Sequence, residues 1–264
     1  MSLVRLGVRV AAVHALIGQT FAAANVHDSK ITPLDALAKE TAQPFVIITT
    51  DDDDQEMRGR DINAGPRRLD LVIEFGLAST ATDGEVTVPH TDAGLEIILD
   101  LMQRQILRAL VDEATAYSTA FKRLVTSING LTSRRGASAE DGVRYAARQM
   151  IINVDTINDP GFGAALDADH PLATLADLLA DQDDTAGLAA LIRSHAEGTP
   201  IADYNRLLID LGMLTTAARG IALGGYNEGE APAALDEVTV ASDDDDGHTM
   251  VLTADDAEAQ FPDA

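Results

Sequence analysis

The feature that most constrains the fold is a nine-residue segment, Leu69–Leu77, in which apolar and other side chains alternate. Leucine, isoleucine and phenylalanine occupy every odd-numbered position, while Asp70, Glu74 and Gly76 stand at even ones. Successive side chains of a β-strand point to opposite faces of a sheet, so this spacing predicts a strand with one buried and one wet face. The chain must therefore build a sheet and cover one side of it.

Two further segments are typical of strands in the same sheet. Phe45–Ile48 is a short apolar run after Pro44, and it leads through two threonines into Asp51–Asp54, which we interpret as a loop. With Leu69–Leu77 it predicts a hairpin joined by a long, mobile connection. Met150–Val154 alternates apolar and polar residues and is expected to stop before Asp159, Pro160 and Gly161.

Apolar residues at helical spacing lie on both sides of these strands. At the N-terminus, basic residues precede an apolar run as in a signal peptide, but steps of three and four from Leu3 to Ile17 favour a packed amphipathic helix. A long helix is expected from a Thr91 cap through Ile128, ending at Gly130. Three shorter helices are expected to begin at Pro171, Thr185 and Thr199, the last of them ending near Gly220.

These elements predict an α+β fold with a small, mostly antiparallel sheet packed by helices, an additional helical segment and an acidic C-terminal extension. We place the α+β core at residues 1–165, the helical segment packed on it at 166–222, and the extension at 223–264. In the extension, Val238–Val240 and Met250–Leu252 flank a polar stretch and predict a hairpin. Whether this hairpin pairs within its own chain or with a neighbour stays open.

The net charge of −24 is concentrated in three stretches without Lys or Arg: Asp51–Glu56, Asp159–Asp184 and the residues after Arg219. The remaining chain has as many acidic as basic residues, so the excess is local. One reading is solvated loops and a tail; the other is a surface that repels another polyanion when several copies surround an axis. The negative charge, together with the absence of Trp, argues against tight binding of nucleic acid.

Sequence motifs for catalysis or for a cofactor are scarce. The chain lacks cysteine, which excludes disulfides and thiolate metal sites, and it has no phosphate-binding loop or nucleophile elbow. Ser242–Gly247 resembles the start of a calcium loop, but Thr253 stands where a bidentate Glu is needed. His27–Asp28 and His90–Asp92 are the remaining candidates for a metal or acid–base site, although turn residues explain both better. We therefore expect no enzyme, no cofactor and no metal, and no stretch reaches the 18 to 20 apolar residues that a membrane span needs.

The order of the segments resembles the tail terminator, or tail completion, proteins of tailed bacteriophages and gene transfer particles. The likeness covers roughly Ser2–Gly163, and Ile201–Leu214 extends it. It is carried by the opening helix, Pro44–Ile48, Asp70–Phe75, the helix entry Pro89–Glu96, Arg144–Arg148 leading into Met150–Val154, and Asp159–Gly163. The helices between Pro171 and His195 and the acidic tail stand outside the likeness as additions.

The resemblance implies a virion protein that is not an enzyme, at the tail–neck junction of a particle assembled in the host cytoplasm. Such proteins form a ring, commonly a hexamer, that caps the tail tube and joins it to the neck or head–tail connector protein. Double-stranded DNA then passes through without tight binding, and no membrane is involved. We assign Asp51, Asp52, Asp53, Asp54 and Glu56 as the channel-lining acidic loop, and Asp243, Asp244, Asp245 and Asp246 as an acidic hairpin tip.

Two alternatives are kept beside this assignment. The first is a head-completion or collar protein nearer the portal, which is the same class of structural protein with a different task. The second is a calcium-binding decoration or adhesion module that uses the Ser242–Gly247 stretch.

Overall fold

The computed structural model describes residues 2–30, 43–57, 59, 65–80, 92–140, 143–163, 165–182, 184–198, 237–241 and 249–253. The chain divides into two compact units, Met1–Ile201 and Ala202–Ala264. The helices of the predicted helical segment that the structure describes belong to the first unit. The helix expected from Thr199 lies outside the described residues.

The first unit is an α+β fold, as the alternating strand predicts. Its sheet has the strand order β1-β2-β3-β5-β4, in which β1 is parallel to β2 and every other pair is antiparallel. In chain order the elements are α1 (Leu3–Leu16), β1 (Val26–Asp28), β2 (Phe45–Gln55), β3 (Arg67–Thr80), α3 (Asp92–Val111), α4 (Ala116–Leu124), β4 (Val125–Glu140), β5 (Val143–Thr156), α5 (Pro171–Ala180) and α6 (Ala186–Glu197).

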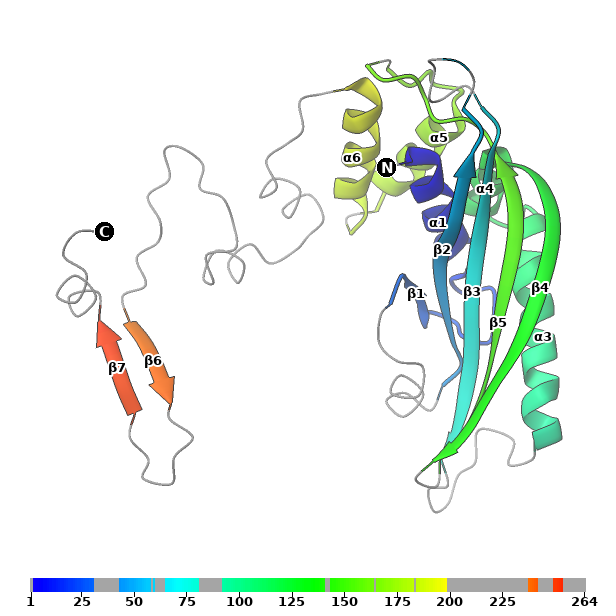
Figure 1. The fold of residues 1–264 in the computed structure, drawn as a ribbon, viewed down its shortest axis with the longest axis vertical. Helices are drawn as coiled ribbons and strands as arrows, with labels where there is room; N and C mark the ends of the chain where they lie inside the picture. The colour runs from blue at the N-terminus through cyan, green and yellow to red at the C-terminus, as the bar shows by residue number, and fades with distance from the viewer. Residues whose placement is uncertain are drawn as a thin grey trace. The chain divides into compact units, whose positions relative to one another are not determined.

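The helices cover one face of the long, curved sheet (Figure 1). The odd-numbered residues Leu69–Leu77 of β3 lie in one buried cluster with Met150, Ile152 and Val154 of β5 and with the apolar residues of the helices. The predicted inward face of this strand is therefore confirmed. The helices beyond Pro171 pack on the same core, because α5 and α6 contribute Leu172, Leu175 and Ile192 to the cluster.

The helix predicted near the N-terminus is present as α1 and is a central element of the core, but its predicted apolar face is only partly right, because Ile17 follows the helix and is exposed. Most of its residues are buried, and Ser2 caps it by accepting a hydrogen bond from the Arg5 backbone N–H. A Cβ atom added at Gly7 would lie 2.7 Å from a Leu172 methyl carbon, so this glycine allows α1 to approach α5 closely. Among the described residues, no helix combines the length and the apolar character that crossing a membrane requires.

The long helix expected from Thr91 to Ile128 is wrong in its second half. Helix α3 ends at Val111, Glu113 has a positive φ of 51°, and Thr115 begins α4 with a capping box to Ser118. The chain then turns into strand β4 at Val125, so Ile128 is a strand residue. The apolar spacing continues across the break because α4 also packs on the core, and spacing alone does not distinguish one bent helix from two.

The loop predicted at Asp51–Asp54 is also wrong, because β2 continues through all four aspartates to Gln55. A β-bulge places Asp51 and Asp52 opposite the single residue Asp70 of β3, and pairing resumes between Asp53 and Leu69. The hairpin between β2 and β3 is confirmed, but its strands reach Gln55 and Arg67. Backbone pairing with β3 holds this acidic run extended, despite the low strand propensity of aspartate.

The second unit contains the predicted C-terminal hairpin. Strand β6 (Glu237–Ala241) pairs with β7 (Thr249–Thr253) antiparallel, with Val238 opposite Leu252 and Val240 opposite Met250. The two predicted strands of the extension thus pair with each other in the single chain. Its tip, Asp243–Asp246, and the calcium-loop resemblance at Ser242–Gly247 lie outside the described residues.

Candidate functional site

The acidic end of β2 divides into one aspartate that faces the core and others that face solvent. The bulge shifts the side-chain alternation, so Asp53 comes to the same face as Leu69, beneath the helices. Its carboxylate lies 3.3 Å from the Arg67 guanidinium and 3.8 Å from that of Arg5. Residues Asp51–Asp54 and Glu56 are all exposed, but the side chain of Asp53 is only 19% exposed. Of the five predicted channel residues, Asp53 is therefore a structural residue, and the other four form an exposed acidic end.

Arg67 is the centre of a buried ion-pair network that the sequence analysis missed. Its side chain is only 9% exposed, and besides Asp53 it binds Asp159 at 3.2 Å and donates a hydrogen bond to Gln55. Arg67 occupies the inward position two residues before Leu69, so a cation on the buried face was the signal for it. A guanidinium in such a place needs carboxylate partners, and the network supplies two.

Asp159 connects this network to the start of α1. One oxygen accepts hydrogen bonds from the Val4 backbone N–H at 2.8 Å and the Ser2 hydroxyl at 3.1 Å, and the other pairs with Arg67. A carboxylate at a helix N-terminus satisfies a free backbone donor and interacts favourably with the helix dipole. Arg5 adds a second link by donating to the Thr50 carbonyl at 2.7 Å. The acidic strand end is thereby fixed to α1.

The opposite face of the sheet carries a polar ladder next to the acidic end. Three cross-strand pairs join β3 to β5: Arg68 with Asp155, Asp70 with Asn153, and Glu74 with Gln149. Asp54 stands directly opposite Arg68 in the register and so shares this face. The predicted wet face of β3 is polar at these three positions, whereas Val72 on the same face is buried. Its acidic groups extend the acidic end of β2 across three strands.

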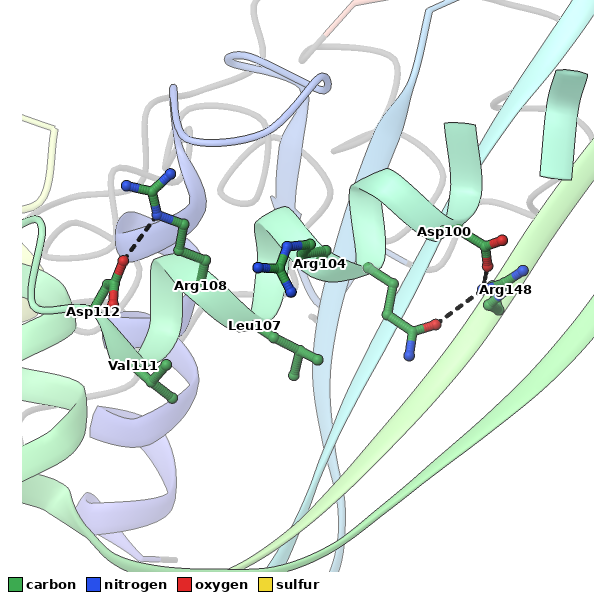
Figure 2. A pocket seen from close by; sticks show the side chains of 8 residues that line it. Asp100, Arg104, Leu107, Arg108, Val111, Asp112 and Arg148 are labelled. Carbon is green, nitrogen blue, oxygen red and sulfur yellow. Dashed lines mark hydrogen bonds and ion pairs between the residues drawn. The ribbon is translucent and has the colours of Figure 1, made fainter. Parts of the chain in front are cut away.

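A groove of about 660 Å³ lies where α3 crosses β5 (Figure 2). Arg148 of β5 donates to Asp100 at 2.6 Å and to Glu96 at 2.9 Å, and Arg135 of β4 also donates to Glu96. The hydrogen bond from Arg135, with help from Arg148, holds the pKa of Glu96 below its usual range. These contacts fasten α3 to the sheet.

The Arg148 contacts lead to a stability prediction. Replacing Arg148 by Met removes a side chain that is only 14% exposed and leaves Asp100 without its ion pair. We expect the free energy of unfolding to fall by about 1–3 kcal/mol, measured by urea denaturation. Arg104→Met is the matched control, because exposed Arg104 lines the same groove without an ion pair to any described residue; its effect should stay within about 0.5 kcal/mol. Equal losses would contradict the fastening role.

Of the two histidines considered for a metal or acid–base site, the structure describes His27, which has a local partner. His27 lies 2.7 Å from the Asn25 side chain, and Asp28 pairs with Arg9 rather than with a histidine. His170 caps α5 by accepting from the Leu172 backbone N–H. No group of three His, Asp or Glu residues suited to a metal ion occurs within the described ranges. His90 lies outside the described ranges, so a shared site of His27 and His90 stays a prediction.

Strand β4, which the sequence analysis did not predict, forms the far edge of the sheet. All residues from 126 to 136 are exposed, including Ile128 and Leu131. Because β4 is mostly polar and contains two glycines, its sequence shows no apolar alternation. Its pairing with β5 reveals it, since fourteen register positions are matched.

Comparison with known proteins adds no assignment. No family model matches the chain, and no curated protein matches it.

Proposed function

We propose that this chain is a non-enzymatic subunit of an oligomeric ring, acting as the tail terminator at the tail–neck junction of a phage-like particle. The observation that carries the proposal is that one sheet has an exposed acidic end on β2 and, at its other side, an edge strand, β4, whose residues 126–136 are exposed. A sheet with one acidic surface and a free edge is suited to lining a channel in a multi-copy assembly.

The acidic end supplies the electrostatic part of the function. Asp51, Asp52, Asp54 and Glu56 are exposed, and Asp70 and Glu74 lie on the polar face of β3. Repeated around an axis in several copies, for instance six, these carboxylates produce a negative potential. A DNA duplex in such a channel is repelled from the wall and stays mobile instead of binding.

The proposed partners follow from this role. They are further copies of this chain, the tail tube protein on one side of the ring and the neck or connector protein on the other. The DNA is a passing polyanion rather than a ligand. A head-completion or collar protein remains the alternative, because an acidic ring nearer the portal has the same electrostatic requirement.

The experiment is disruption of the gene in the genome that encodes the particle, followed by electron microscopy. A tail terminator should leave filled heads and separate tails of irregular, excessive length. A collar protein should instead leave tails of normal length with empty or leaking heads. Particles of normal appearance would contradict both. A rise in melting temperature with calcium would support the decoration module instead.

A further inference from the structure

The two edges of the sheet in the first unit carry opposite charge. One edge is β4 (Val125–Glu140), which contains Arg134 and Arg135 and has a single acidic residue, Glu140, at its end. The other is the end of β2, where four consecutive aspartates begin at Asp51. The basic edge thus lies outside the three acidic stretches that carry the chain's net charge of −24.

The β4 edge is free to accept another strand. Beside β5, β4 pairs with no other strand of the described part of the chain. Soluble proteins usually protect such an edge with proline, lysine or a bulge. Here β4 contains no proline or lysine, and its only charged residues before Glu140 are Arg134 and Arg135, for which the aspartates of β2 are suitable partners. Its irregularities lie between Val125 and Gly130, so the pairing from Leu131 to Glu140 is regular.

The β2 edge is free only along its acidic end. Strand β1 covers Val46–Ile48, and the Arg5 side chain occupies the Thr50 carbonyl. From Asp51 to Gln55, no described strand pairs with the outer side of β2. The open part of this edge therefore coincides with the aspartates.

Strand direction and charge both suit contact between these two edges in different copies. Since β2, β3, β5 and β4 are successively antiparallel, β4 runs opposite to β2. Placing β4 of one copy beside β2 of the next continues the antiparallel sheet. Arg134 is exposed and forms no ion pair with any described residue, and it would then stand beside Asp52 or Asp54, which are also exposed.

We infer that neighbouring copies join head to tail by pairing the Leu131–Gly136 segment of β4 with the Asp51–Gln55 segment of β2 in the next copy. Such a heterologous contact closes into a ring when its rotation allows. The polar face of each sheet lies on the same side as its neighbours' polar faces, which joins their acidic groups into one lining. This inference rests on the proposed function for the closure of the ring, but not for the contact itself.

The absence of cysteine from the chain makes a cross-linking test specific. Two full-length variants carry one cysteine in β4, Thr132→Cys and Ser133→Cys, and two carry one in β2, Asp52→Cys and Asp54→Cys. Each β4 variant is mixed with each β2 variant and oxidised. We expect a mixed disulfide dimer in at least one of the four mixtures. The control is Ala180→Cys, an exposed position on α5. Mixed dimer at or below the level of this control in all four mixtures would overturn the inference.

A charge reversal provides a second readout. Arg134→Glu places a carboxylate beside the aspartates of the next copy, so self-association measured by sedimentation should weaken about tenfold or more. Arg104→Glu is the matched control, because Arg104 is also exposed and without an ion pair to a described residue but lies on α3, outside the contact; it should leave self-association unchanged. Equal effects would overturn the inference.

Failure of this inference is distinguishable from failure of the proposed function. Closed rings without the β4–β2 disulfide would refute the edge contact and leave the tail-terminator proposal standing. Disulfide-linked open chains without a ring would support the contact and count against the ring.

Discussion

Replacing Arg67 by Met is expected to lower the free energy of unfolding by about 3–5 kcal/mol, the largest loss that we predict for a single polar residue. Among the described residues, Arg67 is the one buried cation that pairs with Asp53 and Asp159, and the side chains of these two carboxylates are 19% and 11% exposed. Without it, Asp53 keeps only its 3.8 Å contact with Arg5, and Asp159 keeps its hydrogen bonds from the start of α1 but has no cation in the described part of the chain. Because a domain of this kind has only about 5–15 kcal/mol of stability, the loss should be plain in a denaturation curve.

The control for this prediction is the next residue. Arg68 also pairs with an aspartate, Asp155 at 3.6 Å, but the two side chains are 62% and 35% exposed. Arg68→Met should therefore cost no more than about 1 kcal/mol. Arg67→Lys should give an intermediate loss, since an ammonium keeps the charge but cannot reach Asp53, Asp159 and Gln55 together. Equal losses for Arg67→Met and Arg68→Met would show that the network does not hold α1 to the sheet.

Reversing the charge of the acidic end should give the protein an affinity for duplex DNA that the unmodified protein lacks. In the double variant Asp51→Lys and Glu56→Lys, each copy exchanges two exposed acids for two bases while Asp53 keeps its contact with Arg67. Every phosphate that a lysine neutralises releases counterions, so affinity for duplex DNA should rise about tenfold or more at low salt and fall steeply as salt increases. Filter binding across a salt series measures both effects.

The matched control changes the same number of charges at another surface. Asp181→Lys and Glu197→Lys alter two exposed acids near the C-terminal ends of α5 and α6. This double variant should bind DNA much more weakly than the first, because the proposed channel lies at the polar face of the sheet. Equal DNA binding by the two variants would mean that net charge alone is responsible, and would remove the reason to place the acidic end in a channel.

The sequence predicts those parts of the fold in which the spacing of apolar residues fits only one kind of secondary structure. The alternation around Ile73 identifies a strand and its buried face, and the spacing through Val10 identifies helix α1. The pattern is ambiguous where two elements share a core, which is why α3 and α4 were joined into one helix. Strand β4 was missed because its side chains are exposed on both faces and carry no periodic signal.

The sequence predicts where the acidic site lies, but not that its residues belong to a strand or that Asp53 has a structural role. The aspartate run marks a charged surface, yet strand propensity argues for a loop there, and only pairing with β3 together with the bulge at Asp51 and Asp52 explains the extended backbone. The Asp53 side chain points inward because of that bulge, and no pattern in the local sequence predicts the bulge. Its partner Arg67 is recognisable in retrospect as a cation on the apolar face of a strand.

Negative-stain imaging and native mass spectrometry of the purified full-length protein test the central claim most directly. The account predicts a closed ring of several copies, whose pore of about 20 Å or more admits a DNA duplex. A protein that stays monomeric at every concentration, or that assembles without a pore, would contradict it.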